Sequence, residues 1–167
     1  MSATSSLASA SPRLSAEQVL DRLLSTVDGL ENSRDLTVAK LRENFGVEFA
    51  ERSGRHAFAE PLTSEWWSTI EWDPTDPFGP QLSVTFAPSD PNANPSMAAI
   101  CQMDVERFAS ALIGSGFQRE TYRAEHNRII HEQFVRGALN VLVYPRGESD
   151  GSSEVAAHAC IERVFVR

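Results

Sequence analysis

Two pairs of carboxylates are close enough in the chain to share a catalytic task. Asp73 and Asp76 each precede a proline, and Glu148 and Asp150 lie in a polar run further along. Paired carboxylates can divide the roles of general acid and general base when burial moves their pKa values apart. Both pairs lie in segments that predict exposed turns, where such side chains bond to nearby backbone groups. We therefore interpret them as turn-forming residues.

The histidines and cysteines are the other candidates for chemistry. His126 and His131 are five residues apart across a predicted turn, without a second pair at zinc-ligand spacing. Cys101 could be a nucleophile, but we expect no cation or helix N-terminus beside it to lower the pKa of its thiol. The sequence also lacks a phosphate-binding loop, a dinucleotide fingerprint, a nucleophile elbow and a zinc-protease motif. It therefore predicts a non-enzymatic protein with neither metal nor cofactor.

Three tryptophans lie in or beside a strand predicted over residues 65–72. Because neighbouring side chains on a strand point to opposite faces, Trp66 is expected to face the core and Trp67 to face outward. The loop after this strand contains three prolines, which hold its acidic and aromatic side chains in a fixed arrangement. Tryptophan is a frequent anchor of interfaces. An alternative is that Trp67 covers a small satellite core beneath this loop. The candidate partner-binding residues are Trp67, Trp72, Asp73, Asp76 and Phe78.

The composition limits the classes of partner. The chain has 167 residues, 41% of them hydrophobic, which suffices for one core without a structural metal. Its net charge of −8 repels nucleic-acid phosphates and anionic lipids, so neither nucleic acid nor a membrane is expected as a partner. A partner protein with a basic surface would complement this charge.

The N-terminal residues are small and hydroxyl-rich, unlike an export signal. We expect a disordered tail over residues 1–14 and a single domain over residues 15–167. No run approaches the roughly 18 apolar residues of a membrane span. The chain is therefore expected in the cytoplasm, where Cys101 and Cys160 would stay reduced. The sequence leaves open whether these cysteines lie within bonding distance.

Apolar residues at helical spacing predict three helices. Ser15 begins a capping box with the glutamine three residues later, and the helix is expected to end near Gly29. Asp35 is predicted to cap a second helix that ends at Gly46. Asp104 is predicted to cap a third, which ends at a Gly-Ser-Gly sequence. Period-two alternation predicts strands near residues 47–49, 56–58, 65–72, 81–87, 98–103, 117–123, 128–136, 138–144 and 155–166.

A helix followed by several strands occurs twice, over residues 35–103 and 104–167. The strand beginning at Leu82 has the same alternation as the one beginning at Leu139, and an Ala-x-x-Cys sequence follows each. This pattern suggests a tandem repeat, although alternation is also a general property of strands. Two such units would join into an α+β fold with an antiparallel sheet of six to eight strands and two to three helices on one face.

Three functions are consistent with this architecture. An acidic protein with one open sheet face is typical of a protein-binding module, such as an inhibitor, an immunity protein or a secretion chaperone. A second hypothesis is a small-molecule binder or enzyme with a cavity between sheet and helices. A third is a homodimer that pairs strands 155–166, if that strand lies at an edge. The residues expected to line the cavity of the second hypothesis are Tyr122, His131, Arg136 and Tyr144.

Overall fold

The computed structural model describes residues 11–146 and 159–167. Several sequence predictions lie wholly or partly outside these ranges. They are the first ten residues of the expected tail, the Glu148 and Asp150 pair, the polar turn between the last two strands, and the first four residues of the strand expected over 155–166.

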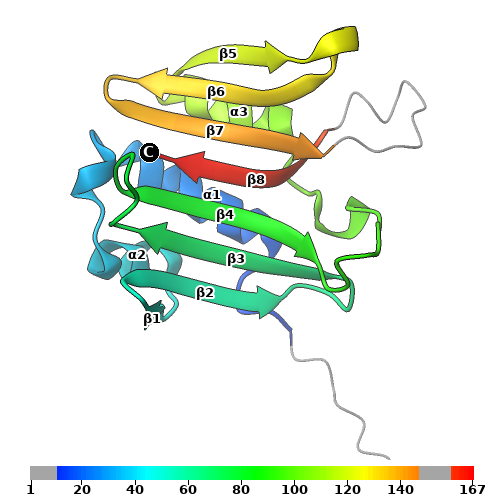
Figure 1. Cartoon of the computed structure of the whole chain (residues 1–167), viewed down its shortest axis with the longest axis horizontal. Helices are drawn as coiled ribbons and strands as arrows, with labels where there is room; N and C mark the ends of the chain where they lie inside the picture. The colour runs from blue at the N-terminus through cyan, green and yellow to red at the C-terminus, as the bar shows by residue number, and fades with distance from the viewer. Residues whose placement is uncertain (1–10, 147–158) are drawn as a thin grey trace, which may run out of the picture.

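The described strands form one antiparallel sheet of eight (Figure 1). Their order is β1-β2-β3-β4-β8-β7-β6-β5, so the chain builds one four-stranded meander from one edge and a second from the other edge. The meanders join where β4 pairs with β8, with Val84 opposite Val164. The strands are β1 (Ala50–Arg52), β2 (Arg55–Pro61), β3 (Trp66–Asp73), β4 (Gln81–Pro88), β5 (Gln118–Arg123), β6 (Ile129–Arg136), β7 (Leu139–Arg146) and β8 (Cys160–Val166).

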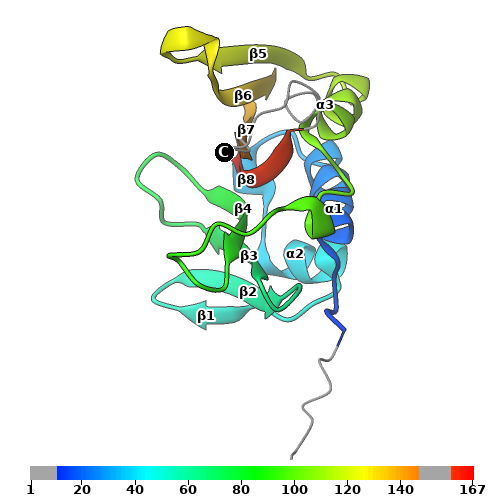
Figure 2. The same ribbon diagram turned by 90° about the vertical axis from the view of Figure 1, so that its right-hand side faces the viewer.

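The described part of the chain has three α-helices, and all lie on one side of this sheet (Figure 2). They are α1 (Ala16–Asp28), α2 (Val38–Phe45) and α3 (Val105–Gly114). None of them is long and apolar enough to span a membrane. The α+β class, with a large antiparallel sheet and helices on one face, is therefore confirmed.

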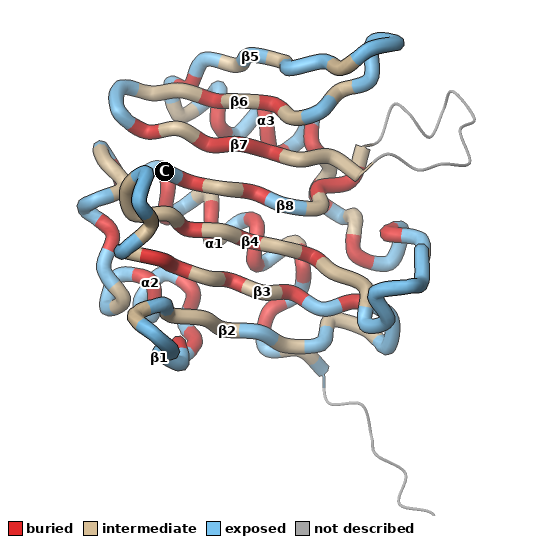
Figure 3. The backbone as a smooth tube through the Cα atoms, viewed as in Figure 1, coloured by how far each residue is buried: buried red, intermediate tan, exposed pale blue. Residues whose placement is uncertain are grey.

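The core lies between the sheet and the helices. Along β3 and β4, buried positions alternate with more exposed ones (Figure 3), as period-two strands require. Phe45 of α2 and Phe108 of α3 are fully buried, and so are Ile70 and Val84 on the sheet. The indole N–H of Trp66 donates to the carbonyl of Ser96 at 3.0 Å, which ties the loop after β4 to the core.

Three local predictions about element boundaries are wrong. The strand expected near residues 47–49 does not form, because β1 begins only at Ala50. Thr37, rather than Asp35, caps α2, because the Thr37 hydroxyl accepts from the N–H of Lys40. Asp35 instead closes a capping box on a separate 3₁₀ turn, η1 (Ser33–Asp35). The segment predicted as a strand over 98–103 forms another 3₁₀ turn, η2 (Ala98–Ile100). Ile100 of this turn and Met103 after it pack in the core without joining the sheet.

The topology corrects two further expectations. β8 lies in the centre of the sheet between β4 and β7, so it cannot supply a free edge for a homodimer. The strand beginning at Leu82 is β4 and the strand beginning at Leu139 is β7, yet by position in the two meanders β4 corresponds to β8. The residue alignment behind the suggested repeat is therefore wrong by one strand, although each half consists of a helix followed by four strands.

Cys101 and Cys160 form a disulfide, with their Cα atoms 5.5 Å apart. The expectation that both would remain reduced is therefore wrong for this structure. The bond links the segment after η2 to the start of β8, across a sequence separation of 59 residues. Disulfides are rare in cytosolic proteins. The cytoplasmic location stays a prediction, and this disulfide argues against it.

Candidate functional site: the open face of the sheet

The face of the sheet opposite the helices is the candidate site, which we call the open face. Its residues follow from strand parity, because Ile70, Val84, Val141 and Val164 are fully buried on the helix side. Their neighbours in sequence point to the other side, and opposite residues of paired strands share a face. The open-face positions on β3, β4, β8 with the residue after it, β7, β6 and β5 are Trp67, Thr69, Glu71, Asp73, Gln81, Ser83, Thr85, Ala87, Arg163, Phe165, Arg167, Asn140, Leu142, Tyr144, His131, Gln133, Val135, Gln118, Glu120 and Tyr122.

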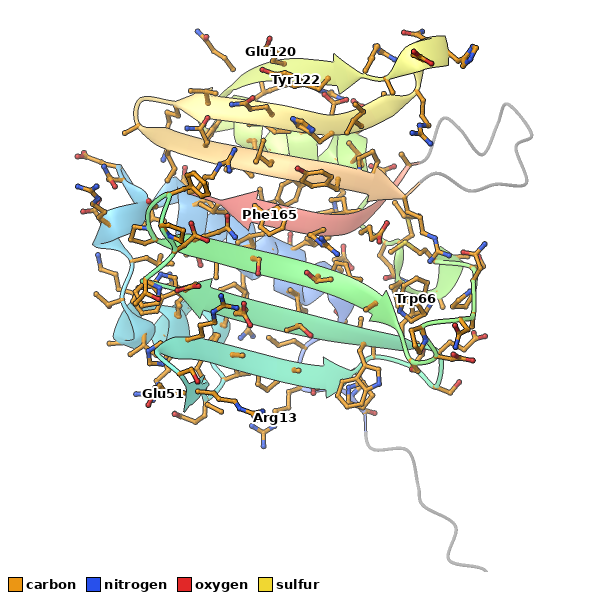
Figure 4. All side chains as sticks on the ribbon, in the orientation of Figure 1. Arg13, Glu51, Trp66, Glu120, Tyr122 and Phe165 are labelled. Atoms are coloured by element: carbon orange, nitrogen blue, oxygen red, sulfur yellow. A yellow bond between two sulfur atoms is a disulfide. The ribbon has the colours of Figure 1, made fainter. Side chains whose placement is uncertain are left out.

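Four rings on the open face form a continuous aromatic row across β5, β6, β7 and β8. Tyr122 stacks on His131 with centroids 4.6 Å apart, and His131 lies 5.2 Å from Tyr144. Tyr144 meets Phe165 edge-on at 5.8 Å. Figure 4 labels the two ends of this row, Tyr122 on β5 and Phe165 on β8. The row therefore joins four strands through side chains that none of the three described helices covers.

Leu142 is an apolar residue of the open face that is buried outside the main core. It lies opposite Phe165 on β8 and Gln133 on β6. Only 5% of its surface is exposed, yet it does not belong to the main core cluster, which contains its neighbours Val141 and Val143. The side chains around it on the open face must therefore shield it from water.

The structure divides the five predicted partner-binding residues between different environments. Trp67 is 41% exposed on the open face, and Phe78 in the loop after β3 is 89% exposed. In Figure 2 this loop rises from the same side of the sheet. Trp72 is instead buried on the helix side, where its ring lies 5.5 Å from that of His56. The side chain of Asp76 accepts from the N–H of Phe78 at 2.9 Å and shapes the loop.

Asp73 is buried at the end of β3 and has three partners. Its carboxylate accepts from the N–H and the hydroxyl of Thr75, at 2.9 and 2.8 Å, and pairs with Arg55 at 2.9 Å. The Thr75 hydroxyl contributes most to holding the pKa of Asp73 below its usual value, and Arg55 adds to this against the opposing effect of burial. Asp73 therefore anchors the loop that presents Phe78.

The residues expected to line a small-molecule cavity do not all meet. Tyr122, His131 and Tyr144 lie together in the aromatic row. Arg136 is on the helix side, where its guanidinium donates to the carbonyls of Val27, Leu30 and Ser115. Within the described ranges, no three His, Cys, Asp or Glu side chains gather in a way that could hold a metal ion.

Sequence reasoning missed the centre of the open face. The sequence analysis does not select Phe165, Leu142, Arg163 or Arg167. Residues 163–167, at the end of β8 and just after it, nevertheless read Arg-Val-Phe-Val-Arg, a pattern that places one aromatic and two cationic residues on the same side. That signal becomes informative only when β8 is known to be central rather than an edge strand.

No family model, curated protein or solved structure matches this chain.

Proposed function

We propose that this chain is a non-enzymatic protein-binding module, of the inhibitor, immunity-protein or secretion-chaperone type, and that its open face holds the partner. The observation that carries the proposal is the aromatic row from Tyr122 to Phe165 on the side without helices. Antiparallel sheets commonly leave one face in water, but that face is then usually polar. A connected row of rings there is unusual for a surface with no partner.

The row has the properties of an interface anchor. Tyrosine and tryptophan contribute a large contact area and lose few rotamers on binding, and they are enriched among residues that dominate binding energy. Contacts between the rings restrict their motion before a partner arrives, which lowers the ordering cost of association. Trp67 adds a separate exposed aromatic side chain on β3, on the other side of β4.

The open face carries small side chains on β3 and β4, against which a partner could pack closely. Opposite Trp67 lies Ala87, and opposite Thr69 lies Thr85. These small side chains lie between Trp67 and the aromatic row, so a partner backbone or helix can approach the sheet there. The open face thus combines large aromatic side chains with a region of small side chains over β3 and β4, a shape suited to a protein surface.

Site-specific photo-crosslinking in the native host tests this proposal. Benzoylphenylalanine would replace Thr85, in the middle of the open face, or Ala111, exposed on the outer side of α3. We expect the Thr85 position to crosslink one defined protein in good yield, and this product to disappear when Tyr144 is changed to Ser. The same product from Ala111, or its persistence after Tyr144→Ser, would overturn the proposal.

A further inference from the structure

The middle of the open face carries two arginines and one aromatic ring in a line, along β8 and the residue after it. Arg163, Phe165 and Arg167 alternate with the buried Val164 and Val166, so all three point to the open face. We call these three residues the β8 stripe. The guanidinium of Arg163 lies 5.8 Å from the centre of the Phe165 ring. At about 3.3 Å per residue, the two arginines are about 13 Å apart along the strand.

Among the described residues no salt bridge joins the arginines of the β8 stripe to a carboxylate, whereas two acids of the open face share one cation. Glu71 and Asp73 both pair with Arg55, at 3.7 and 2.9 Å. Glu120, on β5, lies beside Tyr122 and helps to raise the pKa of that phenol, after the larger effect of burial. Within the described ranges, the centre of the open face therefore presents two guanidinium groups without a salt bridge, although the chain carries a net charge of −8.

A hollow of about 570 Å³ continues the stripe at its C-terminal end. It is lined by Arg167, by Arg34 from η1 and by the exposed Phe78. Arg34, like the arginines of the stripe, has no salt bridge within the described part of the chain. The combination of guanidinium and ring seen on β8 is thus repeated at the end of the strand.

We infer that the β8 stripe binds an acidic segment of the partner protein, with an apolar side chain between its carboxylates. Guanidinium groups bind carboxylates through two parallel hydrogen bonds and also pack on aromatic rings. An extended segment with Asp or Glu four residues apart spans the same 13 Å or so as Arg163 and Arg167. Its intervening apolar residue would pack on Phe165. This inference rests on the proposed binding role of the open face.

The wider charge distribution favours a short acidic segment over a polyanion. Screening limits the reach of exposed charges to about 8 Å at physiological salt. A short peptide on the stripe therefore experiences mainly the local arginines. A nucleic acid extends beyond the stripe over a chain whose net charge is −8, and is repelled by it. The inference thus reverses the expectation, drawn from net charge, of a partner with a basic surface.

Selection from a random library of displayed 12-residue peptides tests the inference even while the partner is unidentified. The immobilised baits are the wild-type chain, the Arg163→Gln, Arg167→Gln double variant and Arg128→Gln, which removes an exposed arginine outside the sheet face. We expect wild type and Arg128→Gln to enrich peptides with Asp or Glu four residues apart. The selected peptides should bind the double variant at least about tenfold more weakly.

Several results of these experiments would contradict an acidic ligand on the β8 stripe. Selection of neutral or basic peptides, no selection at all, or acidic peptides that bind the double variant equally well would each overturn the inference. So would tighter binding of a single-stranded oligonucleotide that the double substitution abolishes. The proposed function fails separately, through the crosslinking at Thr85, since a neutral or basic partner on the open face would satisfy that test while contradicting this one.

Discussion

The ring of Tyr144 meets the ring of Phe165 edge-on, with centroids 5.8 Å apart, in the middle of the face that no helix covers. Tyr144 lies on β7 and Phe165 on β8, so this contact forms beside the junction of the two meanders. On the other face, the same strands contribute Val143 and Val164 to the core. The pairing that completes the fold therefore also assembles the candidate binding surface.

Arg136 is expected to be a major determinant of stability. Its guanidinium donates to carbonyls at the ends of α1 and α3 and lies 4.4 Å from the centre of the Phe117 ring. Arg136→Ala leaves those carbonyls without their charged donor, and we expect a loss of about 3 kcal/mol in the free energy of unfolding. Arg128→Ala, at an exposed position, should change it by less than about 0.5 kcal/mol. Urea denaturation measures both, and equal effects would contradict the assigned role.

Asp73 should make the free energy of unfolding depend on pH in the acidic range. Its pKa is lower in the folded chain than in the unfolded chain, so its stabilising contribution is present above about pH 3.8 and is lost as the pH falls through the folded value. Asp73→Asn should therefore be less stable than wild type at pH 7, with the difference narrowing below pH 3.8. Denaturation at pH 7, 5 and 3 measures this difference.

A matched variant tests how much the Thr75 hydroxyl contributes to the lowered pKa of Asp73. Thr75→Val removes the hydroxyl donor and leaves the Thr75 backbone N–H and Arg55 in place. We expect the carboxyl carbon of Asp73, followed by NMR, to titrate at a higher pH in Thr75→Val than in wild type. A wild-type titration at or above the ordinary aspartate value would show that these bonds do not stabilise the charged form.

The Cys101–Cys160 disulfide should stabilise the fold substantially. Closing a loop of about 60 residues in the unfolded chain corresponds to about 4 kcal/mol in the chain-entropy model. We expect the double variant Cys101→Ala, Cys160→Ala to unfold at clearly lower urea concentration than the oxidised wild type, and reduced wild type to lie near the variant. Mass spectrometry of protein from the native host should detect the bond, and fully reduced cysteines there would contradict it.

Much of the fold was predictable because its signals are local. The capping box at Ser15 is present as expected, and Gly46 ends α2 with a φ of 67°. The joining of two meanders into a sheet with helices on one face also follows from the order of helices and strands. The prediction of a strand after Ala98 is wrong because short apolar runs fit a strand and a packed 3₁₀ turn equally well.

The candidate site was less predictable because it depends on which strands become neighbours. Parity placed Trp67 outward and Trp66 inward, as the structure shows. Phe165 and Tyr144 are 21 positions apart in the sequence, and no local pattern reveals that their rings meet. The disulfide could not be predicted for the same reason, because Cys101 and Cys160 approach each other only when β8 pairs with β4.

The most direct test of the central claim is the affinity of the crosslinked partner for surface variants. The measurement compares wild type with Trp67→Ser, Tyr144→Ser and Ile113→Ser, the last changing an exposed residue of α3 as a matched control. We predict a loss of about 30-fold or more for each open-face variant and less than about threefold for Ile113→Ser, with all three variants folded. Unchanged affinity in both open-face variants, or a larger loss in Ile113→Ser, would contradict the account.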